Sequence, residues 1–213
     1  MKRRAYIERV RRLIYNGQPS DDAVITIGMV NNVLNDAIGV AAKANYKENL
    51  SIDGVAYVNN SFYTTFKGLS VSEDSQFTYK VTLPQIPFGI GNSEGVSMMV
   101  FKDFESKQIS ESVILITATQ KTYFNSMRVI PNKIMALSEG SYIYAYSTLD
   151  LTPYTAQVTM VSGGLSNDLD AELNVPADYI PLMDEYLMKK FILSQSQPVD
   201  ASNDGLDAAR GIQ

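Results

Sequence analysis

Three short segments of the chain hold side chains whose types and spacing could do chemistry. They are a glycine pair in Phe88-Gly89-Ile90-Gly91-Asn92, an acidic loop with Asn167, Asp168 and Asp170, and the adjacent acids Asp184 and Glu185. The glycine pair could cradle a phosphate, but it lacks the preceding strand, the following helix and the full glycine pattern of a phosphate loop. The acidic loop could bind Ca²⁺, but it lacks the ligand ladder and terminal Glu of an EF-hand. The two acids are neighbours on a predicted helix, which is typical of an exposed face rather than an acid/base pair.

Three residue types are absent from the chain, and their absence excludes several kinds of catalytic and metal site. The 213 residues contain no His, no Cys and no Trp. Imidazole and thiolate are the commonest general bases, nucleophiles and transition-metal ligands near neutral pH. A Ser-His-Asp or Cys-His site and a His/Cys zinc site are therefore excluded. We expect a binding or structural protein with no cofactor, no metal site and no catalytic residues.

The strongest local charge lies at the start of the chain, although the net charge is −5. Only Glu8 opposes the basic residues of this segment, which are Lys2, Arg3, Arg4, Arg9, Arg11 and Arg12. We name these six as candidate partner-binding residues. They could dock on an acidic protein patch or on a nucleic-acid backbone. A solvated helix face explains the same charges equally well.

Three helices are predicted to position these residues. In the basic segment, apolar residues spaced three and four apart predict a short amphipathic helix that ends before Asn16-Gly17. A second apolar stripe predicts a helix from Ile27, with Thr26 as its N-cap, to about Tyr46. A third helix is predicted at 177–195, after Pro176.

Between the second and third helices the pattern changes to short β-prone runs separated by turn residues. The predicted strands are Phe62–Val71, Phe77–Leu83, Val96–Phe101, Val113–Thr117, Lys133–Ser138, Ser141–Ser147 and Ala156–Val161. Tyr142, Tyr144 and Tyr146 alternate on one of them and would share a face. The sequence thus predicts an α+β fold, in which the N-terminal helices and a C-terminal helix form a helical layer with an inserted antiparallel β domain. The predicted divisions are 1–49, 50–165, 166–196 and a polar tail at 197–213.

The tail at 197–213 holds too little apolar surface to fold alone, so we expect a partner to order it. Leu206 and Ile212 are its candidate partner-binding anchors. The basic start of the chain is not followed by an apolar stretch, so we expect no signal peptide. No apolar run reaches the roughly 20 residues that span a bilayer, so we expect no membrane partner.

The order of parts resembles a family of viral structural proteins. The resemblance covers about residues 3–210 and rests on strings such as "RRLIYNGQPSDDAVITIGMVNNVLNDAIGVAAKANYK", "YTTFKGLSV", "YKVTLPQIPFGI", "RVIPNKIMALSEGSYIYAY" and "LNVPADYIPLMDEYLMKKFILSQSQPVDASNDGLDAAR". The chain resembles ring-forming neck and head–tail connector proteins of tailed bacteriophages, especially crAss-like phages, and in layout the portal-adaptor proteins of short-tailed phages.

The resemblance implies a non-enzymatic virion protein, assembled in the host cytoplasm, that forms a ring in the phage neck and joins the portal and capsid to the tail. Its partners would be itself, in a ring of about twelve copies, the portal protein, and adjacent neck or tail proteins. Packaged DNA would lie nearby without specific binding. The alternative is a cellular β-rich module that binds a ligand or carbohydrate, for which the three tyrosines could supply an aromatic platform.

Overall fold

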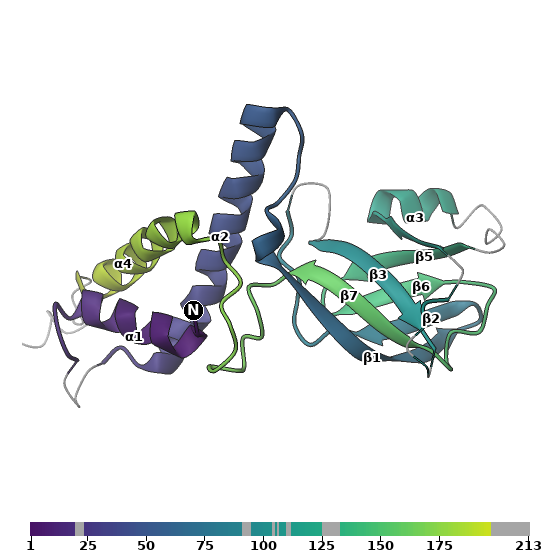
Figure 1. Ribbon diagram of the computed structural model, residues 1–213, viewed down its shortest axis with the longest axis horizontal. Helices are drawn as coiled ribbons and strands as arrows, with labels where there is room; N and C mark the ends of the chain where they lie inside the picture. The colour runs from purple at the N-terminus through teal and green to yellow at the C-terminus, as the bar shows by residue number, and fades with distance from the viewer. Residues whose placement is uncertain are drawn as a thin grey trace, which may run out of the picture.

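The chain builds a helical layer at one end and a β domain at the other (Figure 1). The computed structural model describes residues 1–19, 24–90, 95–103, 105, 107–109, 112–124 and 133–196. These residues form four α-helices and a seven-stranded sheet, so the predicted α+β fold is confirmed. The polypeptide leaves the helical layer after α2, traverses the β domain, and returns to the helical layer as α4 (Figure 1).

The first helix ends before Asn16-Gly17 and the second begins at Ile27, as the sequence predicts. Helix α1 spans Arg3–Ile14, and α2 spans Ile27–Asp53. The Thr26 side chain accepts a hydrogen bond from the backbone N–H of Met29, as expected of an N-cap. The predicted end of α2 at about Tyr46 is wrong, because no Gly or Pro occurs between Tyr46 and Gly54, which closes the helix in the left-handed conformation with φ of 68°.

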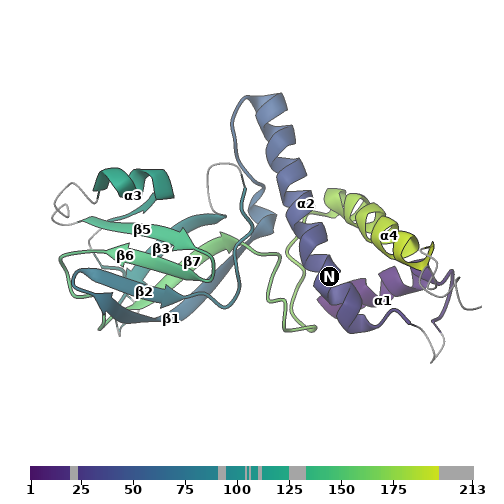
Figure 2. The ribbon, with the colours of Figure 1, turned by 180° about the vertical axis from the view of Figure 1, so that it is seen from behind.

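Helix α4 (Ile180–Ser196) follows the short 3-10 helix η2 (Ala177–Tyr179) and packs against both α1 and α2 (Figure 2). The predicted helical layer is therefore confirmed. Its core includes the buried residues Tyr6, Ile7, Val10, Val30, Leu34, Ala37, Ile38, Ala41, Ala42, Met183, Leu187 and Phe191. Within the described ranges, no helix is long and apolar enough to cross a membrane.

The β domain follows the 3-10 helix η1 (Asn60–Phe62). Its strands are β1 (Tyr63–Ser75), β2 (Thr78–Thr82), β3 (Val96–Lys102), β4 (Ser112–Ile116), β5 (Lys133–Glu139), β6 (Tyr142–Tyr146) and β7 (Thr155–Val161). Each predicted strand overlaps one of them. Their order in the sheet is β3-β7-β1-β2-β6-β5-β4.

The expectation of a wholly antiparallel sheet is wrong for one pair, because β4 and β5 run parallel. Helix α3 (Ala118–Phe124) lies between these two strands in the chain and covers the sheet beside β5 (Figure 1). A crossover of this kind carries the chain back to the starting end of the sheet, so the next strand runs in the same direction. The other neighbouring strands are antiparallel.

The sheet curls until its two outer strands, β3 and β4, contact each other. A single antiparallel bridge between Lys102 and Gln108 extends pairing at the β3 edge. The register of β1 against β7 shifts between Phe66 and Leu69, and Gly68 within this bulge has φ of 68°. Alternate residues of the strands fill the interior, and Phe101, Ile134, Ile143 and Val158 are fully buried there.

Two segments join the helical layer to the β domain. They are residues 54–59, after α2, and residues 162–176, after β7. Gln85, in the loop after β2, holds the second segment, because its amide nitrogen donates to the Ser162 carbonyl at 2.8 Å and its amide oxygen accepts from the Ser166 N–H at 3.1 Å. Gly163 follows β7 with φ of +64° and lies directly against Ile38 of α2. A Cβ at position 163 would be 2.7 Å from two carbons of Ile38, so only glycine fits this contact without displacement.

Candidate partner-binding surfaces

Arg3, a predicted partner-binding residue, lies inside the helical layer. Its side chain is almost fully buried and donates to the amide oxygens of Asn31 at 2.6 Å and Asn35 at 2.5 Å. No described residue accepts a hydrogen bond from its second terminal nitrogen. Burial lowers the pKa of Arg3 to about 10. Arg3 therefore serves α1–α2 packing and is not presented to a partner in this conformation.

Arg9 contributes to a contact between α1 and α4. Its guanidinium donates to Asp184 at 2.5 Å, and the Tyr6 hydroxyl donates to the other carboxylate oxygen at 2.9 Å. Burial and this hydrogen bond raise the pKa of Tyr6. The interpretation of Asp184 and Glu185 as one exposed face is wrong for Asp184, whose side chain is only 16% exposed. Glu185 is exposed and pairs with Lys189 at 2.5 Å.

Two further arginines contact neighbouring loops. Arg4 lies 3.4 Å from the carboxylate of Asp170, and Arg11 donates to the backbone carbonyl of Ile25 at 3.0 Å. Asp168 accepts a hydrogen bond from the Asp170 N–H at 2.9 Å, which shapes the acidic loop as a turn. These contacts hold the segments that flank α1, and they occupy charges that the sequence alone would leave available.

Lys2 and Arg12 remain exposed at the two ends of α1. The side chain of neither forms an ion pair or a hydrogen bond within the part of the chain that the structure describes. Arg12 lines a surface hollow of about 280 Å³ together with Glu8, Arg11, Gln18 and Pro19. Of the six basic candidates, Lys2 and Arg12 are thus best placed to meet a partner. Leu206 and Ile212 lie outside the described residues.

The tyrosines of β6 lie on the outer face of the sheet, as their alternation predicts. Tyr142, Tyr144 and Tyr146 are half-buried, while the residues between them point inward. Lysines already lie over these rings. The Lys80 amine is 3.8 Å from the ring centroid of Tyr142, and the Lys121 amine is 5.9 Å from those of Tyr144 and Tyr146. A sugar that stacked here would have to displace these amines.

Lys121 is held in place by a second contact. It donates to Glu139 at 3.0 Å, and this bond raises the pKa of the Lys121 amine. The amine therefore stays charged over the tyrosines near neutral pH, and the row resembles a packed outer face more than an open aromatic platform.

Sequence reasoning missed a surface at the end of α2 where, among the described residues, four exposed apolar side chains lie close together in the chain. Figure 1 shows this end projecting beyond the other helices. Leu50, Ile52, Val55 and Tyr57 are 46%, 73%, 59% and 46% exposed, respectively. We call residues 50–57 the α2 projection. Its apolar residues were visible in the sequence, but they were assigned to the start of the β region.

The remaining chemical candidates do not assemble into a site. Phe88 and Ile90 lead into strand β3 rather than into a helix, which is not the setting of a phosphate loop, and Gly91 and Asn92 lie outside the described residues. No group of three or more His, Cys, Asp or Glu side chains in the described ranges could hold a metal ion. Comparison of the chain with protein-family models and with curated proteins gives no match.

Proposed function

We propose that the chain is a non-enzymatic structural protein of a phage virion. In this proposal it forms a ring in the neck, contacts the portal protein on one side, and connects the capsid to the tail on the other. The observation that carries the proposal is the α2 projection, where four apolar side chains are between 46% and 73% exposed.

The exposed apolar side chains of the α2 projection would be stabilised by contact with a partner. Burying a Leu, Ile or Val side chain stabilises a contact by about 1.5–3 kcal/mol relative to leaving it in water. Scattered single apolar residues are ordinary on protein surfaces, whereas contiguous ones mark interaction sites. Leu50, Ile52, Val55 and Tyr57 lie within eight residues at the end of one helix. A subunit that is complete only in an assembly accounts for this arrangement.

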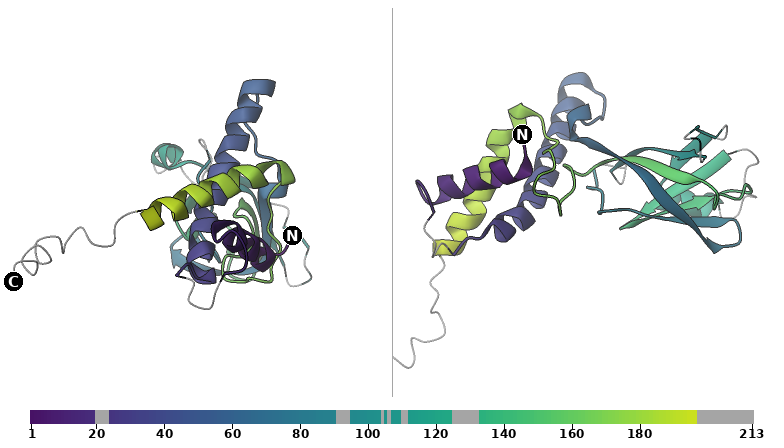
Figure 3. Two further views of the ribbon diagram at one scale, coloured as in Figure 1. Left: turned by 90° about the vertical axis from the view of Figure 1, so that its left-hand side faces the viewer. Right: turned by 60° about the horizontal axis from the view of Figure 1, so that its bottom comes forward.

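The exposed cations and the shape support the same proposal. Lys2 and Arg12 are available to bind an acidic protein partner. The rest of the chain is acidic enough to repel the DNA that must slide past. The elongated form, with helices at one end and a β domain at the other, presents several separate faces (Figure 3). Such faces suit a subunit with neighbours in its own ring and in the rings above and below.

Co-expression with the portal protein of the same virus tests the proposal. Size-exclusion chromatography followed by native mass spectrometry should show a portal complex that carries about twelve copies of the chain. The isolated chain need not form the ring, because the portal supplies a template that shifts the assembly equilibrium. Absence of any complex, or a stable two-fold dimer in the presence of portal, would contradict the proposal.

A further inference from the structure

We propose that the α2 projection of one copy docks on the C-terminal end of α1 of a second copy, where Arg12 and Leu13 form the receiving surface. The inference rests on the proposed ring and names the contact between its adjacent subunits. Both surfaces are present on every copy. Each subunit would therefore bind one neighbour through its α2 projection and another through the C-terminal end of its α1.

The α2 projection is a built structure rather than a frayed helix end. After Gly54 the chain folds back along the helix, and the side-chain amide of Asn49 donates to the Tyr57 carbonyl at 3.0 Å. The Tyr57 hydroxyl donates to Asp53 at 2.8 Å, and Asn45 accepts from the Asn59 N–H at 2.8 Å. Docking would therefore require little ordering, which favours affinity.

The charge of the α2 projection is the first argument for its partner. Asp53 is the last residue of α2, and the last turn of this described helix contains no basic residue. The C-terminal end of a helix carries a partial negative charge, so Asp53 adds a like charge where a cation is favoured. The end of α2 therefore lacks a cation, and an arginine is well suited to bind both a carboxylate and free carbonyls.

The C-terminal end of α1 presents that cation beside an apolar residue. Arg12 is exposed at a hollow of about 280 Å³, and Leu13 next to it is 41% exposed. Arg11 is already bonded to Ile25, which leaves Arg12 as the available guanidinium of this turn. We assign Arg12 to Asp53 of the second copy, and Leu13 to the apolar side chains of Ile52 and Val55.

The geometry excludes the same contact within one chain. The α2 projection and α1 lie at different ends of the helical layer in Figure 1 and in the reverse view of Figure 2. A contact between two different surfaces is heterologous, so each added copy leaves one surface of each kind free. Such contacts build a closed ring when the rotation between copies closes. This is the assembly that the proposed function requires.

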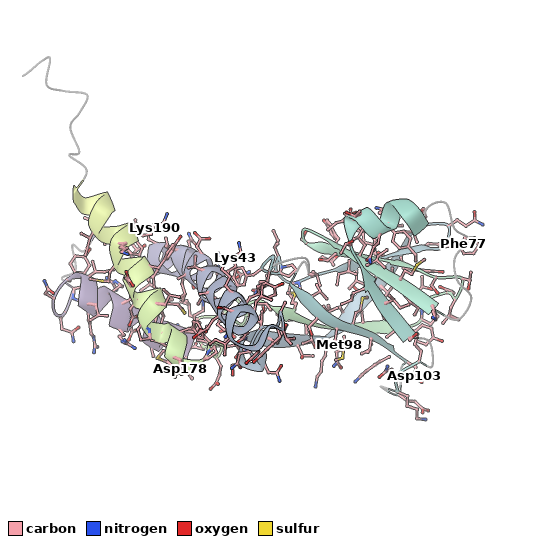
Figure 4. The ribbon with its side chains drawn as sticks, turned by 90° about the horizontal axis from the view of Figure 1, so that it is seen from above. Lys43, Phe77, Met98, Asp103, Asp178 and Lys190 are labelled. Carbon is pink, nitrogen blue, oxygen red and sulfur yellow. The ribbon has the colours of Figure 1, made fainter. Side chains whose placement is uncertain are left out.

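Because the natural chain contains no Cys, cross-linking locates the contact directly. The Val55→Cys/Leu13→Cys variant, treated with a short bismaleimide, should give a ladder of multimers beyond the dimer. Val55→Cys alone should give no ladder, because its partner surface lacks a thiol. The matched control is Val55→Cys/Met98→Cys, since Met98 is also exposed but lies on β3, away from the helical layer (Figure 4). A ladder from this control as strong as that from the test pair would overturn the inference.

Charge reversal tests the assignment of Arg12 to Asp53. Asp53→Arg and Arg12→Asp should each weaken self-association at least tenfold in sedimentation equilibrium, and the two changes in one chain should restore it. Lys43→Asp is the matched control, because Lys43 is an exposed cation in the middle of α2 (Figure 4). It should leave association within twofold of the unchanged chain. Equal weakening by Lys43→Asp, or no recovery in the double variant, would overturn the assignment.

Both experiments are performed with and without portal, which separates this inference from the proposed function. If the unchanged chain joins the portal and Ile52→Asp/Val55→Asp joins equally well, the docking inference is wrong while the ring proposal stands. If the chain cross-links through positions 13 and 55 but never joins the portal, the contact is real and the neck function is wrong. A cross-linking pattern that shows no ladder in either condition overturns the docking inference.

Discussion

Replacing Gly163 with Ala should destabilise the protein by about 2–4 kcal/mol. Gly163 has φ of +64°, and an L-residue in this left-handed conformation costs about 1–2 kcal/mol. The new Cβ would also lie 2.7 Å from both Cδ1 and Cγ2 of Ile38, and overpacking of this kind costs about 1–3 kcal/mol. Ala restricts the unfolded chain more than Gly does, which offsets about 0.4–1 kcal/mol of the loss.

The assay is urea unfolding followed by circular dichroism, with Gly140→Ala as the matched control. Gly140 has nearly the same φ, +61°, but no described atom lies within 4 Å of the position its Cβ would take. The control should therefore lose only about 1 kcal/mol from backbone strain. The difference between the two variants measures the steric conflict at the junction of the helical layer and the β domain.

A double-mutant cycle with Ile38→Ala completes the test. Removing the Ile38 side chain beyond Cβ should make Gly163→Ala less costly by at least about 1 kcal/mol than in the unchanged chain, because the clashing atoms are gone. Equal losses for Gly163→Ala and Gly140→Ala, or a cycle with no coupling, would refute the described contact between α2 and the loop after β7.

Three further predictions concern α1. Arg3→Ala removes two charge-assisted hydrogen bonds and should lower the free energy of unfolding by about 2 kcal/mol. Arg3→Met should lower it less, because methionine keeps the packing and removes a buried charge. Equal stability of both variants and the unchanged chain in urea unfolding would contradict this prediction. Arg12→Ala should leave the unfolding free energy within about 0.5 kcal/mol, because this exposed side chain has no partner in the described part of its own chain; a larger loss would show an intrachain role. The pKa of Tyr6 is raised in the folded state, so its contribution to the free energy of unfolding is fully present below the unfolded value of 10.0 and is lost as pH rises above it. The difference in unfolding free energy between the unchanged chain and Tyr6→Phe should therefore shrink above that pH. A constant difference in unfolding titrations would count against the buried hydrogen bond to Asp184.

Elements with a clear apolar period were predictable from the sequence. The stripe that begins at Ile27 placed the start of α2, and alternation along Tyr142–Tyr146 placed the tyrosines on one face. The end of α2 was not predictable in this way, because Leu50 and Ile52 are exposed and do not continue the buried apolar stripe of the helix. Their β-prone character then resembled the start of a strand.

The partners of the basic residues were also beyond sequence reasoning. Arg9 meets Asp184, which lies 175 residues away in the chain, and Arg3 meets two asparagines on α2. A local run of charges does not reveal whether its counter-charges lie in the same chain or in a partner. The parallel pairing of β4 and β5 was not predicted for a related reason. Strand direction follows from the crossover through α3 and not from the strand residues themselves.

The position and symmetry of the chain on its portal test the central proposal most directly. A cryo-electron microscopy map of the co-expressed complex should show a ring of about twelve copies against one face of the portal. Averaging without imposed symmetry should place the helical layer of each copy against that of its neighbour. A map in which the portal carries no ring, or in which the chain binds as isolated copies or two-fold dimers, would contradict the account.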